Sequence, residues 1–211
     1  MDRANEITEQ LRAIRNVESV VVYGPDEANL LIVTTDLEPA TLRTLADPVR
    51  WWIKKTASWP RLFTAALIQD SLDVFPIEIL ELSQRRRVLY GNDPFVAVRI
   101  DHGALRIQCE RELREKMMRL REAYVEHHGT YDLVDVSRQT FARIFRGCLV
   151  LFDMPVPTDD DDVIKALCAR LDLDARPFFD GDFESYYRVL SATEARIDRL
   201  IVSKRRRYEA Q

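Results

Sequence analysis

Histidine, glycine and cysteine are scarce in this chain, which restricts the chemistry that it can perform. Its 211 residues include three histidines, six glycines and three cysteines. With only His102, His127 and His128 available, a histidine-based metal centre or a Ser-His-Asp triad has few ways to form. The motifs Gly-x-Gly-x-x-Gly, Walker A, Gly-x-Ser-x-Gly and His-Glu-x-x-His are all absent. The sequence therefore lacks the signatures of Rossmann enzymes, P-loop proteins, α/β-hydrolases and zinc peptidases.

Long hydrophobic runs are missing as well. No apolar run approaches the roughly 20 residues that span a bilayer, and Met1 to Glu6 lack the basic-then-apolar form of a secretion signal. Cys109, Cys148 and Cys168 show no Cys-x-x-Cys spacing and fall on apolar helical faces, so we interpret them as reduced core residues rather than disulfides or zinc ligands. We expect a cytoplasmic protein that does not bind a membrane.

The chain has no excess of positive charge. It carries 31 lysines and arginines against 35 aspartates and glutamates, a formal net charge of −4. Affinity for nucleic acid comes mostly from the neutralisation of phosphates, so this balance argues against a nucleic acid as the main partner. The length is sufficient to bury a sizeable core, in one domain or in two small ones packed together.

The most informative segment that is present covers residues 20–34. Two apolar runs, Val20–Tyr23 and Leu30–Val33, are separated by Gly-Pro-Asp-Glu-Ala-Asn. Apolar runs of this length on either side of turn-forming residues predict two buried strands. Taken alone, the intervening residues are typical of a hairpin turn.

The same segment resembles the nucleotidyltransferase superfold, in which a first strand ends in Gly-Ser and the next strand opens with Asp-x-Asp. Here Gly24-Pro25 stands at the Gly-Ser position, and Glu27-Ala28-Asn29 stands at the Asp-x-Asp position. A longer resemblance, to bacterial nucleotidyltransferase-like proteins with an all-helical C-terminal half, runs in order over residues 15–125. It is carried by residues 71–80, 87–95 and 105–113.

The resemblance implies a site for Mg²⁺ and ATP, because carboxylates on neighbouring strands hold the metal ions that bridge the phosphates in this superfold. Glu27 and Glu78 become the candidate metal ligands, with Asn29 at the remaining catalytic position. The resemblance places residues 77–80 on the strand that carries the third carboxylate in active nucleotidyltransferases, which makes Glu78 the candidate for that position. Its alternative role is that of an exposed or salt-bridged glutamate near the arginines at 85–87.

The remaining candidates are Gly24, which the resemblance places near the nucleotide phosphates, and Arg85 and Arg87, which belong to a basic run that could meet a phosphate or simply be solvated. Two departures weaken the pattern. Asn29 supplies only a neutral oxygen. Because a unit charge about 4 Å from another contributes roughly 4 kcal/mol at an effective dielectric constant of 20, the loss of one carboxylate should weaken the binding of a divalent ion substantially. The turn is also short, and Pro25 has no N–H to offer a phosphate.

These departures favour a catalytically impaired nucleotidyltransferase-like protein that acts as a nucleotide-binding or protein-interaction module. One alternative is an active Mg²⁺-dependent enzyme that moves a nucleotidyl group from ATP to a hydroxyl acceptor. Another is a helical interaction protein that forms a homodimer, or binds a different protein, through an exposed tryptophan or the Met117-Met118 surface.

Two further features concern the predicted helices. Residues 39–57 are predicted to be helical with a break or kink near Asp47, because Pro48 lacks an N–H. The adjacent Trp51 and Trp52 cannot share one helix face, so we expect one of them in the core and the other at a cleft or a partner surface.

From residue 101 onward the apolar spacing predicts helices at about 105–124, 137–152, 158–171 and 183–204. They resemble the higher-eukaryote-and-prokaryote nucleotide-binding (HEPN) bundle. Some HEPN ribonucleases use an Arg and a His a few residues apart, but Arg121 and His127 lie on largely different helix faces, and His127 is better interpreted as a helix C-terminal residue. The overall prediction is an α+β fold: a small mixed β-sheet of nucleotidyltransferase type in residues 1–100, followed by an all-α helical bundle in residues 101–211.

Overall fold

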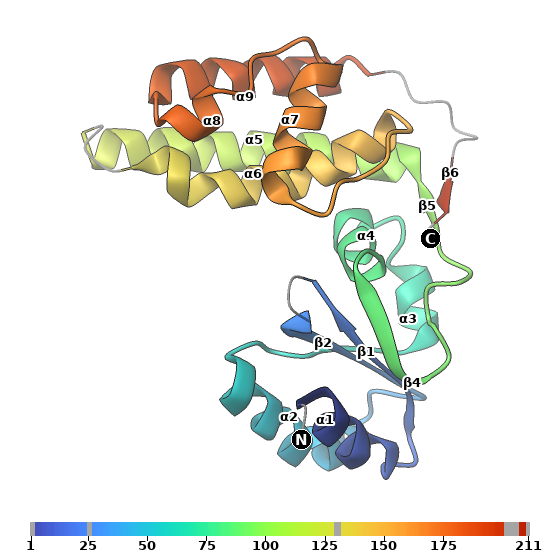
Figure 1. Cartoon of the computed structure of the whole chain (residues 1–211). Coiled ribbons are helices and arrows are strands. Elements are labelled where there is room, and N and C mark those ends of the chain that lie inside the picture. The colour runs from blue at the N-terminus through green and yellow to red at the C-terminus, as the bar shows by residue number, and fades with distance from the viewer. Residues whose placement is uncertain (1–2, 25–26, 129–131, 201–206, 210–211) are drawn as a thin grey trace. The chain divides into compact units, whose positions relative to one another are not determined.

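The computed structural model describes residues 3–24, 27–128, 132–200 and 207–209 (Figure 1). The chain forms two compact units, one of Met1–Ile100 with Glu209–Gln211 and one of Asp101–Tyr208. The first contains a small mixed sheet with helices, and the second is built from helices. The predicted α+β fold class is therefore confirmed. A separate two-stranded sheet is formed by β5 (Arg99–Asp101) and β6 (Arg207–Glu209).

The first unit is organised by a four-stranded sheet with the order β3-β2-β1-β4. Its strands are β1 (Val17–Tyr23), β2 (Asn29–Thr34), β3 (Arg61–Phe63) and β4 (Arg86–Gly91). The central strand β1 is antiparallel to both β2 and β4, whereas β2 and β3 are parallel. The two strands predicted from the apolar runs thus form a hairpin at the centre of the sheet, with Tyr23 opposite Asn29 beside the turn.

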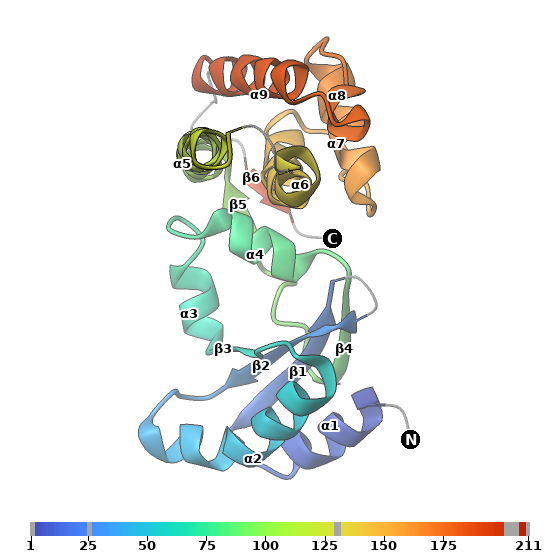
Figure 2. The ribbon, with the colours of Figure 1, turned by 90° about the vertical axis from the view of Figure 1, so that its left-hand side faces the viewer.

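Helices cover both faces of this sheet. On one face lie α1 (Arg3–Arg12) and α2 (Pro39–Thr56), and on the other lie α3 (Ala65–Asp70) and α4 (Pro76–Ser83) (Figures 1 and 2). Successive strand residues point to opposite faces, so alternate valines of β1 contact the α1–α2 layer. The resulting core contains Ile7, Leu11, Val17, Val20, Val22, Leu30, Ile32, Leu45 and Trp52.

The expected break at Asp47 is wrong. α2 continues through Pro48, whose side chain is buried. A proline inside a helix removes one hydrogen bond. In α2 both halves of the helix pack on the same core, through Leu45 before the proline and Trp52 after it, and this burial offsets the lost bond. Trp52 is the core tryptophan, as expected for one of the pair, while Trp51 is partly buried against the same cluster.

The predicted strand at residues 77–80 is also wrong, because these residues belong to α4. Pro76 occupies the first turn of this helix, where its missing N–H costs nothing and its fixed φ favours helical geometry. A four-residue segment such as Ile77-Glu78-Ile79-Leu80 is too short for its apolar spacing to distinguish a strand from a buried helix. Glu78 consequently lies in the first turn of a helix rather than on the sheet.

The second unit consists of α5 (His102–Glu126), α6 (Leu133–Leu151), α7 (Asp160–Arg170), the short α8 (Pro177–Asp180) and α9 (Phe183–Asp198). The long first helix and the helix that follows it are predicted correctly. α5 ends with His127 as its C-cap, in agreement with the interpretation of that histidine. The last helix ends at Asp198, and residues 201–204 of its predicted extension lie outside the described residues.

Aromatic side chains fill the core of the helical unit. The rings of Phe141, Phe178 and Tyr186 meet edge to face, with centroids 4.8 Å apart for Phe178 and Tyr186 and 6.1 Å apart for Phe141 and Tyr186. Burial raises the pKa of the Tyr186 hydroxyl, which forms a hydrogen bond of 2.8 Å with Ser137 Oγ. The three cysteines are buried and free, as predicted. None of the helices in the described part of the chain combines the length and the apolar character needed to cross a membrane.

Candidate functional site

The turn between β1 and β2 forms one corner of the first unit, and most of the predicted site residues meet there. Gly24 has a φ of +79°, and its N–H donates to the carbonyl oxygen of Arg85 at 3.0 Å. A Cβ atom at this position would lie 2.8 Å from Asn29 Nδ2. Glycine therefore allows both the left-handed backbone and the close approach of the asparagine. Pro25 and Asp26 lie outside the described residues.

Glu27 is held by an arginine of the neighbouring strand. Arg87 in β4 donates from Nε to Oε1 at 2.6 Å and from Nη2 to Oε2 at 2.5 Å, so both carboxylate oxygens are engaged by one guanidinium. These hydrogen bonds, followed by the positive charge, hold the pKa of Glu27 below its ordinary value. Both side chains remain partly exposed. The carboxylate that the resemblance assigns to a metal ion is thus bound to a cation of the protein itself.

Asn29 is likewise engaged within the protein. Its Oδ1 accepts a hydrogen bond of 2.8 Å from Ser58 Oγ, in the segment that leads from α2 to β3. The amide oxygen is the only atom through which asparagine ligates a hard cation. The next residue, Trp59, is 75% exposed. The corner therefore combines a carboxylate that is ion-paired with Arg87, an amide oxygen that already accepts a hydrogen bond, and an exposed indole.

The strand beside β2 carries no carboxylate. β3 consists of Arg61, Leu62 and Phe63, and Arg61 pairs with Leu31 in the parallel register. Across the four described strands of the sheet, Glu18 is the single acidic residue, and it is exposed at the start of β1. β3 therefore offers no carboxylate to a metal ion beside Asn29.

The sheet geometry explains which predicted residues come together. Gly24, Glu27, Asn29, Arg87 and the backbone of Arg85 lie at the corner, whereas Glu78 belongs to α4 and is partly buried there. Among the described residues no group of three or more His, Cys, Asp or Glu side chains is placed to hold a metal ion. These donors do not fit a Mg²⁺–ATP site, because both oxygens of one carboxylate are bound to Arg87 and the second ligand is a neutral amide.

The adjacent arginine of the triplet has a structural role. Arg86 donates from Nη2 to Asp93 Oδ2 at 2.8 Å and also bonds the carbonyl oxygen of Ser83. Burial alone would raise the pKa of Asp93, but the hydrogen bonds from Arg86 and from the Phe95 N–H hold it below its ordinary value. This mostly buried pair ties β4 to the segment that follows it.

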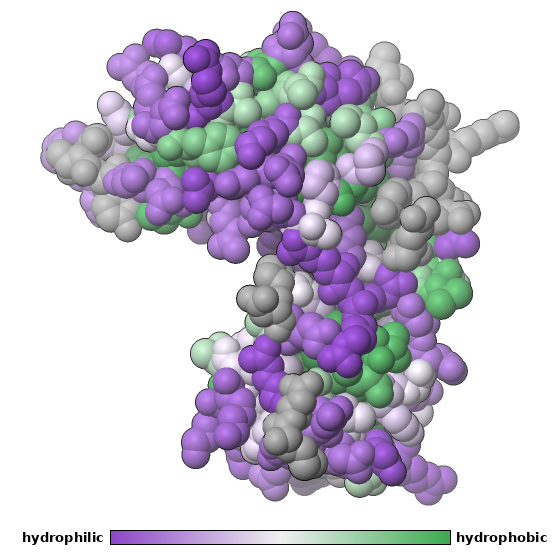
Figure 3. Space-filling model, viewed as in Figure 1, coloured by the Kyte–Doolittle hydropathy of each residue, from purple (hydrophilic) through white to green (hydrophobic). Residues whose placement is uncertain are grey.

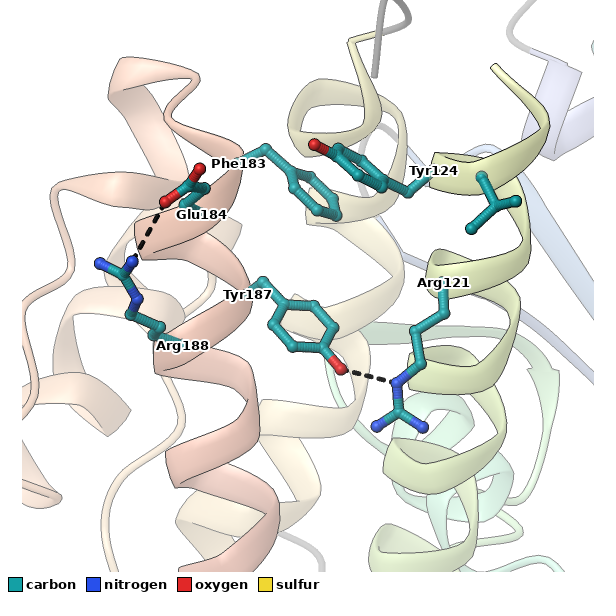
Figure 4. A pocket seen from close by; sticks show the side chains of 7 residues that line it. Arg121, Tyr124, Phe183, Glu184, Tyr187 and Arg188 are labelled. Atoms are coloured by element: carbon teal, nitrogen blue, oxygen red, sulfur yellow. Dashed lines mark hydrogen bonds and ion pairs between the residues drawn. The ribbon is translucent and has the colours of Figure 1, made fainter. Parts of the chain in front are cut away.

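A second site lies in the helical unit and was not predicted from the sequence. A pocket of about 390 Å³ opens between the C-terminal part of α5 and the start of α9 (Figure 4). Its lining is mainly apolar and aromatic, with three charged residues, and consists of Arg121, Tyr124, Val125, Phe183, Glu184, Tyr187 and Arg188. Figure 3 shows hydrophobic side chains exposed among hydrophilic ones on this unit. Tyr187 is partly buried at the pocket, whereas its neighbour Tyr186 is fully buried in the core.

The pocket could have been suspected from two short spacings. Arg121 and Tyr124 are three residues apart, and Phe183 and Tyr187 are four apart, so each pair shares a helix face. Nothing in the sequence indicates that the two faces oppose one another, since 58 or more residues separate them in the chain and the contact is made by folding.

Comparisons with known proteins give little further information. No family model and no curated protein matches the chain. Among solved structures, the chain is similar to a chain in the structure of a tri-AMPylated Shewanella oneidensis HEPN toxin in complex with MNT antitoxin. The similarity covers 43% of this chain and 71% of that chain, with 14% sequence identity and a TM-score of 0.28. The link to that complex is loose and does not define a family for this chain.

Proposed function

We propose that this chain is a nucleotidyltransferase-like protein that does not transfer nucleotides and acts instead as a binding module. The observation that supports this proposal is the two-point hydrogen bonding between Glu27 and Arg87. A Mg²⁺ ion bound to this carboxylate would lie beside the guanidinium of Arg87, so the two positive charges would repel each other unless the charge-assisted pair is broken. The neutral Asn29 and the arginine in β3 leave little negative charge to compensate.

The first test is a calorimetric titration of the whole chain with ATP and Mg²⁺. We expect no metal-dependent heat at millimolar ATP and no transfer of radiolabel from ATP to the chain. Arg87→Ala releases the carboxylate of Glu27. The matched control is Arg85→Ala, which removes an exposed arginine whose side chain is not hydrogen-bonded to Glu27. Micromolar, Mg²⁺-dependent binding that Glu27→Ala abolishes would contradict the proposal and support the active transferase.

A protein partner is favoured by one specific observation at the same corner. Trp59 is 75% exposed and follows Ser58, the residue that is hydrogen-bonded to Asn29. Tryptophan is enriched among the residues that dominate protein–protein binding energies, because it offers a large apolar area with few rotatable bonds. We therefore place the binding surface around Trp59, and the simplest partner is a second copy of the chain.

Light scattering on the purified chain tests this surface. We expect a dimer that dissociates in the micromolar range and that is converted to a monomer by Trp59→Ser. Val136→Ser, which changes an exposed apolar residue of the helical unit, is the control and should leave the dimer intact. A wild-type chain that remains monomeric at high concentration would rule out the second copy as the partner.

A further inference from the structure

The pocket between α5 and α9 has an aromatic wall contributed by both helices. The rings of Tyr124 and Phe183 are stacked, with centroids 4.3 Å apart and planes inclined by 10°. The ring of Tyr187 lies 6.0 Å from that of Phe183 (Figure 4). Small-molecule sites are mainly apolar or aromatic clefts of about 300–1,000 Å³ with a few placed polar groups. The volume of about 390 Å³ lies at the lower end of this range and suits a ligand with a single ring or two fused rings.

The charges of the pocket leave one cation unbalanced. Arg188 is paired with Glu184 at 3.1 Å on the same helix. Arg121 donates from Nε to the hydroxyl of Tyr187 at 2.6 Å, which fixes its orientation beside the ring. No carboxylate in the described part of the chain forms an ion pair with Arg121. Its two terminal nitrogens are thus left for a ligand, at the edge of the aromatic wall (Figure 4).

We propose that this pocket binds a small aromatic carboxylate, with its ring against Phe183 and Tyr187 and its carboxylate on the terminal nitrogens of Arg121. The guanidinium group is planar and matches a carboxylate through two parallel hydrogen bonds. A single net positive charge suits a monoanion. A nucleoside triphosphate, which carries several negative charges, would require more cations than the lining provides.

The orientation of Arg121 strengthens this assignment. An exposed arginine loses side-chain entropy when it binds a ligand, and that loss reduces affinity. Here the hydrogen bond to Tyr187 already restricts the guanidinium before any ligand arrives. Tyr187 is in turn held beside Phe183 on the preceding turn of α9. The recognition group and the aromatic wall are therefore linked, and both belong to helices rather than to loops.

The test is calorimetric titration of the full chain with 2-naphthoate, and with uncharged 2-naphthamide as its isostere. We expect 2-naphthoate to bind with a Kd in the micromolar to low millimolar range. Arg121→Gln should weaken it at least about tenfold, as expected when a charge-assisted hydrogen bond is removed. Binding of 2-naphthamide should be about as weak as that of 2-naphthoate to the variant, and should not change with Arg121→Gln.

Three further variants complete the design. Arg119→Gln removes a cation of the same helix that is 70% exposed, pairs with Glu115 and does not line the pocket, so 2-naphthoate should bind as to the wild type. Glu27→Ala, in the other unit, should also have no effect, which separates this proposal from that for the β1–β2 corner. Tyr187→Phe keeps the ring but removes the hydroxyl that orients Arg121, and should weaken binding a few-fold.

Several results would overturn the proposal. These are the absence of heat from the wild-type chain at 10 mM 2-naphthoate, equal binding by the wild type and Arg121→Gln, or equal affinities for the acid and the amide. Tighter binding of AMP than of 2-naphthoate, with the same dependence on Arg121, would also overturn it, because the ligand would then be a phosphate. Circular dichroism melts of each variant verify that the helices are intact.

Discussion

Gly91→Ala is expected to lower the free energy of unfolding of the first unit by at least about 3 kcal/mol, one of the largest effects of any single substitution in the chain. Gly91 ends β4 with a φ of +75°, a region that side chains rarely adopt. A Cβ atom there would lie 1.8 Å from the carbonyl oxygen of Glu18 and 3.0 Å from Ser19 Cα. Both contacts are with the backbone of β1, so no side-chain rotation relieves them and β4 must shift relative to β1.

Denaturant unfolding followed by circular dichroism measures this effect. Gly181→Ala is the matched control, because Gly181 has a similar φ of +73° but no atom within 4 Å of an added Cβ. That variant should show only the left-handed backbone penalty, about 1 kcal/mol. Equal losses in the two variants would mean that the contact with β1 is unimportant and that backbone conformation alone determines the effect.

The second large effect is expected at Trp52, which is completely buried between α2 and the sheet. Trp52→Ala should cost about 3–5 kcal/mol, since it removes the largest side chain of the core and leaves a cavity. Trp52→Phe should cost much less. The indole Nε1 has no hydrogen-bond partner within the described residues, so phenylalanine loses packing volume but no hydrogen bond.

The neighbouring tryptophan provides the comparison. Trp51 is only partly buried against the same cluster, and Trp51→Ala should cost less than half as much as Trp52→Ala. Denaturant unfolding curves of Trp52→Ala, Trp52→Phe and Trp51→Ala, measured in parallel, give the free energies of unfolding to be compared. A larger loss for Trp51→Ala, or a loss for Trp52→Phe as great as that for Trp52→Ala, would show that the packing of α2 differs from the arrangement described.

The parts of the fold that the sequence predicted well are those determined by local pattern. The β1–β2 hairpin follows from two apolar runs around turn residues, and α5 follows from a stripe of apolar residues that continues for more than five turns. Local pattern failed where the segment was short or where packing opposed propensity. Residues 77–80 fitted both periods, and Pro48 is tolerated in α2 because the core holds the helix on both sides of it.

The candidate site likewise has one part that local sequence predicts and another part that it does not. Gly24, Glu27 and Asn29 are within six residues of one another, so their proximity was predictable from the turn that contains them. The contact that determines the chemistry of Glu27 comes from Arg87, 60 residues away in sequence and brought beside it by the pairing of β1 with β4. Similarly, Arg121 and Tyr187 meet only because α5 packs against α9. Such distant pairs depend on topology, which residue spacing does not encode.

The placement of the tryptophans provides an intrinsic optical probe. Trp51, Trp52 and Trp59 all belong to the first unit, and the helical unit contains none. Indole emission therefore reports on the sheet-containing unit alone, with Trp52 inside its core and Trp59 in contact with solvent. Comparison of an emission curve with the loss of helical ellipticity would reveal, on the unlabelled wild-type chain, whether the two units melt as one cooperative block or in succession.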